Sequence, residues 1–94
     1  MKVIANNVAT GATAVTLPCF GYSQLKILVG SVAVQMLFNY QKTPKEEGDY
    51  VTLTANKEYL ITGEDGKNFW NIWFKSATAS TLTVTGLNEG FTTL

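Results

Sequence analysis

Residues 24–37 read QLKILVGSVAVQML and predict two strands joined by a short turn at Gly30-Ser31. Glycine at the first central position suits a type II′ turn, whose twist matches that of two antiparallel strands. In this hairpin the opposed pairs on one face are all apolar: Val29 with Val32, Ile27 with Val34, and Leu25 with Met36. A slip of one residue would turn that whole set toward solvent, so the register is well specified. We therefore expect a β-hairpin whose apolar face lies in a core.

The rest of the chain predicts further short strands separated by turn residues. Segments that alternate or favour extended structure occur at 2–5, 13–17, 50–54, 57–62, 69–75 and 81–85. With the hairpin they make roughly seven or eight strands at spacings of about 8–12 residues, which is typical of a sandwich or barrel. No segment keeps a period of about 3.6 residues over the length of a helix. The expected fold is one all-β domain over residues 1–94, a small antiparallel β-sandwich or jelly roll.

The alternation also predicts which side chains form the core. The residues expected to be buried are Ile27, Val34, Val51, Ile72, Phe74 and Val84. The most polar stretch, QKTPKEEGD at 41–49, is expected to be an exposed loop, and GEDGKN at 63–68 a tight turn. A chain of 94 residues buries roughly 60–70% of the surface that its unfolded form exposes. Contacts with other copies or with a partner would therefore add stability to a thin core.

The charged residues argue against some classes of function. Seven lysines balance seven acidic residues, and the chain contains neither arginine nor histidine. Arginine provides bidentate contacts to phosphates and base edges, and the lysines form no basic stripe, so we expect no nucleic-acid binding. Histidine is the commonest general base and the commonest metal ligand, so its absence argues against an enzyme and against a metal site.

The remaining candidates for chemistry are one thiol and two groups of carboxylates. The single cysteine is Cys19, which has no disulfide partner within the chain and no histidine to activate it. We interpret it as a small buried side chain. The acidic residues gather in the 41–49 loop and the 63–68 turn, where solvated loop charge is the simplest interpretation. We expect no catalytic residues, no metal and no cofactor.

The start of the chain, MKVIANN, has no long apolar run because Asn6 and Asn7 interrupt it. A secretory signal needs an apolar region of about 7–15 residues, and a spanning helix needs about 20. We therefore expect no signal peptide, no membrane association and synthesis in the cytoplasm.

The stretch FWNIWFK at 69–75 is the feature that most suggests recognition. Alternation places Phe69 and Trp73 on the face opposite to the predicted core residues. Because a sandwich strand has only one face toward the core, this second aromatic face needs its own explanation. It is covered by another segment of the chain, buried by a partner, or, least simply, used to stack sugars. We predict that Phe69 and Trp73 belong to an interface and that Tyr40 and Tyr59 extend it.

Several segments follow one another in a characteristic order: ATGATAVTLP at 9–18, the Gly-Ser turn, the polar loop, GDYVTLTANKEYLI at 48–61, the aromatic strand, and SATASTLTVTG at 76–86. This order resembles small β-sandwich accessory proteins of tailed-phage virions, such as auxiliary or decoration proteins of the capsid. The resemblance covers roughly residues 3–87 and lies in pattern and order. The long 41–49 loop departs from the plainest form of the pattern.

The resemblance implies a non-enzymatic structural protein that coats or staples a virion shell. Its partners would be the major capsid protein or other virion proteins, bound in many copies or as a homo-oligomer, and it would be located in the virion after synthesis in the host cytoplasm. The alternative is a carbohydrate- or receptor-recognition module of a phage tail or head fibre. Such a module would expose aromatic residues in a groove beside hydrogen-bonding side chains.

Overall fold

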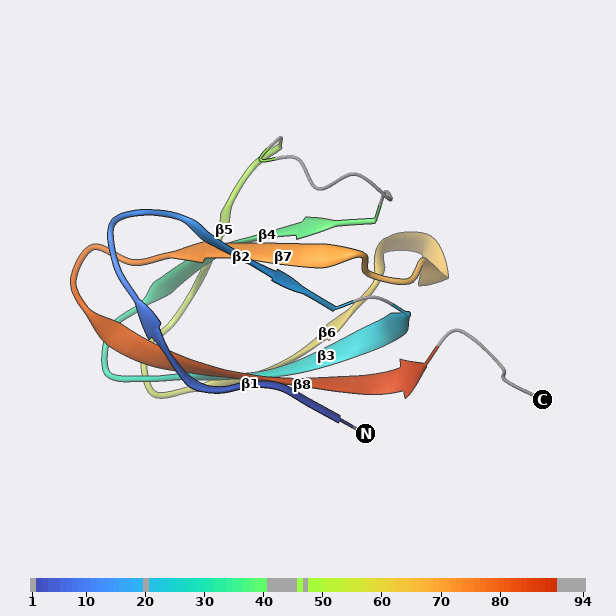
Figure 1. Ribbon diagram of the computed structural model, residues 1–94, viewed down its shortest axis with the longest axis horizontal. Helices are drawn as coiled ribbons and strands as arrows, with labels where there is room; N and C mark the ends of the chain where they lie inside the picture. The colour runs from blue at the N-terminus through green and yellow to red at the C-terminus, as the bar shows by residue number, and fades with distance from the viewer. Residues whose placement is uncertain (1, 20, 41–45, 47, 90–94) are drawn as a thin grey trace.

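The computed structural model describes residues 2–19, 21–40, 46 and 48–89, which form eight strands and one short 3₁₀-helix (Figure 1). The strands are β1 (Lys2–Thr10), β2 (Val15–Pro18), β3 (Tyr22–Val29), β4 (Val34–Asn39), β5 (Val51–Leu53), β6 (Glu58–Thr62), β7 (Asn71–Lys75) and β8 (Ser80–Glu89). The helix, η1, covers Glu64–Gly66. All pairings between these strands are antiparallel, so the prediction of an antiparallel all-β fold is confirmed.

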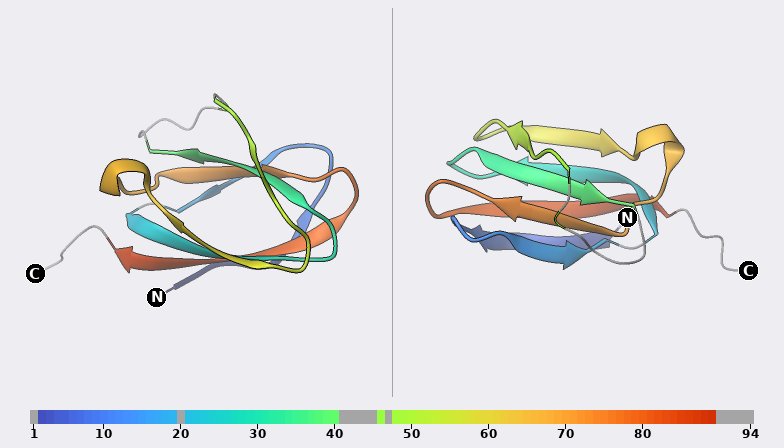
Figure 2. Two further views of the ribbon diagram at one scale, coloured as in Figure 1. Left: turned by 180° about the vertical axis from the view of Figure 1, so that it is seen from behind. Right: turned by 90° about the horizontal axis from the view of Figure 1, so that it is seen from above.

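The strands form two four-stranded sheets that pack face to face (Figure 2). We call them sheet A, with the order β1-β8-β3-β6, and sheet B, with the order β2-β7-β4-β5. The chain crosses from one sheet to the other at every connection except the one between β4 and β5. This arrangement is that of an eight-stranded jelly roll, one of the architectures that the sequence pattern predicted.

The segment at 24–37 is not the hairpin that its pattern predicts. β3 pairs with β6 and β8 in sheet A, whereas β4 pairs with β5 and β7 in sheet B. Gly30 does not have the positive φ that a type II′ turn requires at this position. Its N–H donates to the Thr81 carbonyl oxygen at 3.0 Å, and its carbonyl oxygen accepts from the Asn56 N–H at 2.8 Å. The connection is therefore an arch between the two sheets.

The apolar face of this segment was predicted correctly although its pairing was not. Its residues that are 2% exposed or less are Leu25, Ile27, Val29, Val34 and Met36, and Val32 is partly buried. Two strands that face each other across a sandwich show the same alternation as two neighbours in one sheet. The alternation therefore identifies the buried side chains, but it does not identify the strand that supplies the hydrogen bonds.

Five of the six residues expected in the core are fully buried, namely Ile27, Val34, Ile72, Phe74 and Val84. The prediction for Val51 was wrong, because its side chain is 47% exposed. β5 is a three-residue edge strand, and Val51 begins it at the rim of the sandwich. Leu53, two residues further along the same strand, is buried.

Some boundaries differ from those expected from the sequence. β1 runs on to Thr10, and β7 begins at Asn71 rather than at residue 69. The 63–68 turn contains η1. Most of the polar loop at 41–49 lies outside the described residues, and its described residues, 46, 48 and 49, are exposed.

Candidate binding surface

Phe69 was predicted on an outer surface, and this prediction was wrong. Its side chain is 0% exposed, its ring centroid lies 5.5 Å from that of Phe38, and it stacks on Tyr40 at 5.3 Å between centroids. The residue precedes β7, so the alternation of that strand does not extend to it. Its N–H donates to the Tyr22 carbonyl oxygen, and its own carbonyl oxygen accepts from the Gly21 N–H. Phe69 is thus bonded to the beginning of β3 and contributes to the core.

The other three residues of the predicted interface are partly buried. Tyr40 packs against the core, and its hydroxyl oxygen accepts a hydrogen bond from the Glu64 N–H at 3.2 Å. Tyr59 packs against the core from β6, and its hydroxyl oxygen accepts from the Thr54 N–H at 2.8 Å. Trp73 lies on β7 in sheet B, whereas Tyr59 lies on β6 in sheet A. The structure does not bring the four predicted residues together on one aromatic surface.

On the outer face of sheet B, the chain itself covers Leu37 and partly covers Trp73. The Trp73 indole Nε1–H donates to Asn39 Oδ1 at 2.8 Å. Leu37, which is opposite Trp73 on β4, is only 5% exposed. The backbone of Gly48 lies against this leucine, because a Cβ atom added at Gly48 would be 3.4 Å from Leu37 Cδ1. This environment fits the simplest of the three explanations for a second aromatic face, which is cover by another segment of the chain.

Tyr50 extends the same cover at the β5 side of sheet B. The Lys75 Nζ atom lies 4.2 Å from the centroid of the Tyr50 ring, which is a cation–π contact. The Tyr50 hydroxyl donates to Glu46 Oε1 at 2.8 Å. Burial, and then the hydrogen bond and charge of Glu46, raise the pKa of Tyr50 to about 12. The phenol therefore stays protonated and keeps this hydrogen bond at neutral pH.

Cys19 is buried, as the sequence predicted. Burial raises the pKa of its thiol to about 12, so the nucleophilic thiolate form does not accumulate at neutral pH. Among the described residues, no group of three histidine, cysteine or acidic side chains is arranged to hold a metal ion. In the same part of the chain, no helix has the length and apolar character needed to cross a membrane.

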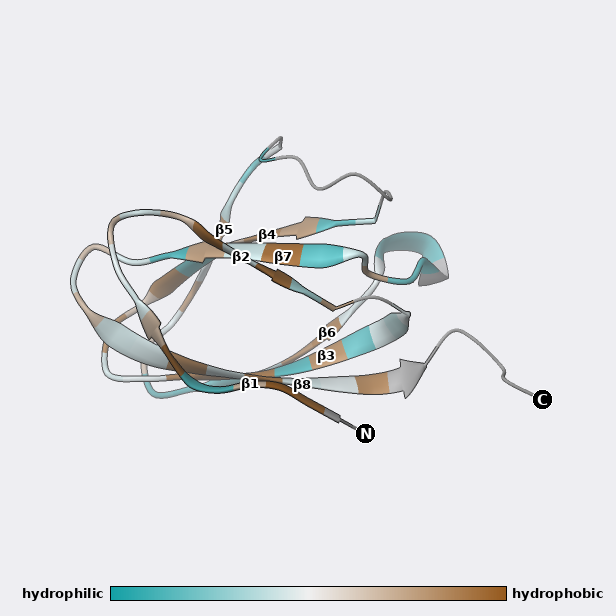
Figure 3. Ribbon diagram, viewed as in Figure 1, coloured by the Kyte–Doolittle hydropathy of each residue, from teal (hydrophilic) through white to brown (hydrophobic). Residues whose placement is uncertain are grey.

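The outer face of sheet A exposes large apolar side chains. Val3 is 56% exposed, Leu28 48% and Leu60 60%, and they lie on β1, β3 and β6. The register places Val3, Thr85, Lys26 and Leu60 in one row across the sheet. Opposed residues of an antiparallel sheet point to the same face, so the whole row faces outward. The apolar beginning of β1 on this side of the molecule is visible in Figure 3.

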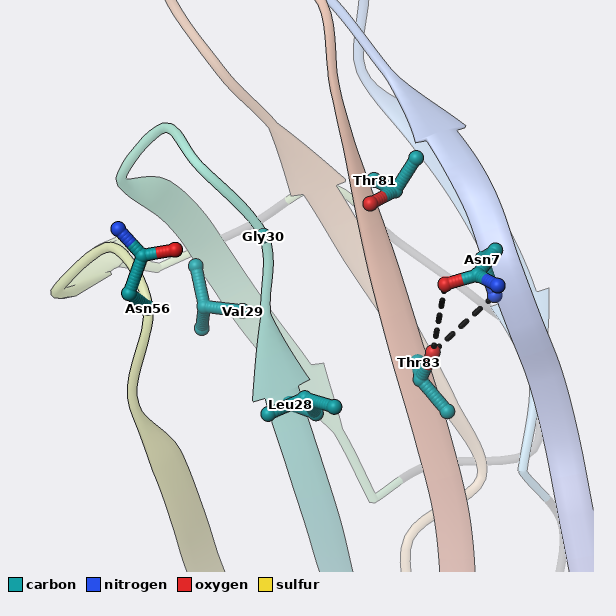
Figure 4. A pocket seen from close by; sticks show the side chains of 7 residues that line it. All are labelled: Asn7, Leu28, Val29, Gly30, Asn56, Thr81 and Thr83. Carbon is teal, nitrogen blue, oxygen red and sulfur yellow. Dashed lines mark hydrogen bonds between the residues drawn. The ribbon is translucent and has the colours of Figure 1, made fainter.

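An open hollow of about 320 Å³ lies on the same face, at the end of β3 (Figure 4). Its lining residues are Asn7, Leu28, Val29, Gly30, Asn56, Thr81 and Thr83. The Asn7 N–H donates to Thr83 Oγ1 at 3.1 Å. Asn7 and Asn56 have left-handed backbones with φ of 50° and 58°, which asparagine adopts more readily than most residues. Two tight backbone bends therefore lie on the two sides of the hollow.

The charges on this face neutralise each other. Lys26 Nζ lies 3.5 Å from Glu58 Oε1, and both side chains are about half exposed. Such a solvated pair contributes little to stability, roughly 0–1 kcal/mol. The face therefore offers aliphatic side chains, hydroxyls and amides, and the Lys26–Glu58 ion pair on it carries no net charge.

Sequence reasoning missed this face because it gave most weight to the aromatic residues. The signal was nevertheless present in the alternation. Leu28 falls on the face of the 24–37 segment opposite to the core set, and Leu60 stands between two inward residues, Tyr59 and Ile61. A leucine on the outer face of an alternating strand indicates exposed apolar surface, and two on adjacent strands indicate a patch.

Comparisons with known proteins assign no family to this chain. No protein-family model, no curated protein and no solved structure matches it. The class of protein is thus defined by its architecture and surface: an antiparallel jelly-roll sandwich that covers the large apolar side chains on the outer face of sheet B and exposes those on the outer face of sheet A.

Proposed function

We propose that this chain is a structural accessory protein of a tailed-phage virion, which binds the major capsid protein or another virion protein by burying the outer face of sheet A. The observation that carries the proposal is the presence of Val3, Leu28 and Leu60 on this one face, each at least 48% exposed. Leu28 and Leu60 lie on adjacent strands and Val3 on the opposite edge of the same sheet, and exposed apolar surface of this kind can mark a protein interaction site. The order of the sequence features supplies the virion part of the proposal, because it resembles that class of protein.

Burial of this face would favour binding. Full burial of a valine or leucine side chain contributes roughly 1.5–3 kcal/mol relative to full exposure, and these side chains are about half exposed. A stable interface buries about 800 Å² on each partner, so the surrounding threonines would also be in contact. Where many copies bind one shell, moderate contacts between neighbours add to the attachment of each copy.

The fold and composition are compatible with this role. Jelly rolls occur both in capsid proteins and in lectins, so the architecture alone does not select a function. The composition favours a structural binder over a nucleic-acid-binding protein or an acid–base enzyme, because the chain lacks arginine and histidine.

Electron microscopy of particles purified with and without the protein tests the proposal, since a bound accessory protein adds density to the shell. We expect Leu28→Lys to weaken attachment at least about tenfold, because a lysine would replace an apolar contact, while the free protein stays folded. Val51→Lys is the matched control, because Val51 is similarly exposed but lies on sheet B. Particles without added density, or full occupancy by a folded Leu28→Lys variant, would contradict the proposal.

A second candidate function, recognition of a carbohydrate or receptor, is favoured by the hollow. Amide and hydroxyl side chains line the hollow together with the aliphatic side chain of Leu28; they belong to Asn7, Asn56, Thr81 and Thr83. The residues that line it include no aromatic ring on which a sugar could stack. A screen of glycans by NMR distinguishes the candidates: shifts confined to residues of the hollow, which Thr83→Ala abolishes, would favour recognition over shell attachment.

A further inference from the structure

The four edge strands of the two sheets differ in how well they are protected from pairing with another chain. β1 has two register shifts along its pairing with β8, β2 has four residues and ends at Pro18, and β5 has only three residues. β6 has five residues, no proline or glycine, and an unbroken register with β3. Unprotected edges of this kind are templates for a further strand. β6 is therefore the edge most able to accept one.

The hydrogen bonds that flank β6 show which of its backbone groups are free. The Gly63 N–H donates to the Ser23 carbonyl oxygen at 2.8 Å, and the Val29 N–H donates to the Lys57 carbonyl oxygen at 2.9 Å. In an antiparallel ladder every second opposed pair exchanges hydrogen bonds, so the backbone N–H and C=O groups of residues 57, 59, 61 and 63 point toward β3.

The backbone groups of Glu58, Leu60 and Thr62 consequently face away from the sheet. Among the described residues, no strand pairs with this side of β6. All three residues are exposed, and Leu60 has the largest exposed fraction of the exposed large apolar residues in the described part of the chain. The free edge thus combines unpaired backbone groups with an apolar side chain at its centre.

We propose that two copies of this chain associate by antiparallel pairing of β6 with β6 of the second copy, about a two-fold axis at Leu60. The two four-stranded sheets A would then form one continuous sheet. Leu60 would lie opposite Leu60, and Glu58 opposite Thr62 of the other copy. Since these are the residues whose backbones face outward, each of the three opposed pairs would form two hydrogen bonds.

The sequence of β6, EYLIT, is suited to pairing with itself. Antiparallel pairing about Leu60 opposes the Glu58 carboxylate to a neutral threonine, and it opposes Tyr59 to Ile61, an aromatic and β-branched pair of the kind that stabilises sheets. Centring the axis on Glu58 would oppose two carboxylates, and centring it on Tyr59 would oppose Glu58 to Leu60. The register about Leu60 avoids both arrangements, which favours a second copy as the occupant and an isologous dimer as the result.

Leu60→Pro tests the proposal with little disturbance of the monomer. Proline lacks the N–H that would bond the second copy, and it is tolerated on an edge strand when that N–H faces outward. We expect the unmodified protein to dimerise with rising concentration in sedimentation equilibrium, and Leu60→Pro to weaken the dimer at least about tenfold. A protein that stays monomeric at all concentrations, or a Leu60→Pro dimer of unchanged affinity, would overturn the proposal.

A second pair of variants keeps the test decisive if proline disturbs the fold. Leu60→Lys would oppose two lysines at the axis, so it should weaken the dimer by a similar factor. Val3→Lys introduces the same residue at a similarly exposed position on the opposite edge of sheet A, and it should leave the dimer unchanged. Equal dimer affinity in the two lysine variants would contradict the assignment of β6 as the dimer interface.

The dimer and the proposed shell attachment are tested independently. Loss of shell attachment in Leu28→Lys with a normal dimer would separate this inference from the proposed function.

Cross-linking with a short thiol reagent tests the register. Cys19 is buried and its thiol pKa is raised, so it should react slowly with the reagent and only the introduced cysteines should cross-link. Leu60→Cys should cross-link to itself, whereas Glu58→Cys and Thr62→Cys should cross-link efficiently only when the two variants are mixed. Efficient cross-linking of Glu58→Cys with itself would overturn the proposed register.

Discussion

The two outer faces of the sandwich differ in what covers them. On sheet B, Trp73 is hydrogen-bonded to its neighbouring strand, and Leu37 is nearly buried and lies against the backbone of Gly48. On sheet A, Leu28 and Leu60 stand open to solvent. On these two faces, the large Trp73 side chain already makes contacts within the domain, whereas the smaller Leu28 and Leu60 side chains remain available to a partner.

The largest effect is expected from Phe69, which belongs to the core between the two faces. Phe69→Ala should lower the free energy of unfolding by about 3–5 kcal/mol, because it removes a fully buried ring and leaves a cavity. Urea denaturation measures this loss, with Leu28→Ala as a control on the open face. A Phe69→Ala variant as stable as the unmodified protein would place the ring outside the core.

The inner side of sheet A should be sensitive to a single added methyl group. A Cβ atom at Gly86 would lie 2.6 Å from the Tyr22 ring, so Gly86→Ala should cost about 1–3 kcal/mol. Gly11→Ala is the matched control, because nothing lies within 4 Å of the added atom. Thermal unfolding of the two variants compares them, and equal melting temperatures would contradict the close packing of Tyr22 on Gly86.

The two outer faces should respond differently to truncation. Trp73→Ala should destabilise the free protein by about 1–2 kcal/mol, because it uncovers Leu37 and removes the hydrogen bond to Asn39. Leu28→Ala should change stability by about 0.5 kcal/mol or less. Equal stability of the two variants would show that Trp73 contributes no more to the stability of the domain than Leu28 does.

The smallest effect is expected from the ion pair on the open face. Lys26→Met should change the free energy of unfolding by no more than about 0.5 kcal/mol, since Lys26 and Glu58 are both about half exposed to solvent. Chemical denaturation at low and high salt provides the measurement. A larger loss, present only at low salt, would show that the pair supports the sheet.

The sequence allowed the fold class and most of the core to be predicted, because alternation reports directly which side chains turn inward. It did not allow the pairing of β3 and β4 to be predicted. A hairpin and an arch between sheets bury the same residues, and only Gly30 and its bonds to distant strands distinguish them.

The candidate surface was harder to predict for a related reason. The alternation of the strand at 71–75 was extended back to Phe69, which comes two residues before β7 begins. As a result, a ring that lies in the core was predicted on the outer face. Exposure at Leu28 and Leu60 depends on the absence of a covering segment, which no local pattern encodes.

The position of β8 between β1 and β3 has a consequence for synthesis on the ribosome. β8 is the last of the eight strands along the chain, yet β1 and β3 are joined in sheet A only through it. Until β8 emerges, β1 has no partner strand and one long edge of β3 stays open. Sheet A therefore cannot be completed until residues 80–89 have emerged. Such non-local pairing folds slowly, and it leaves unpaired strands exposed to neighbouring nascent chains.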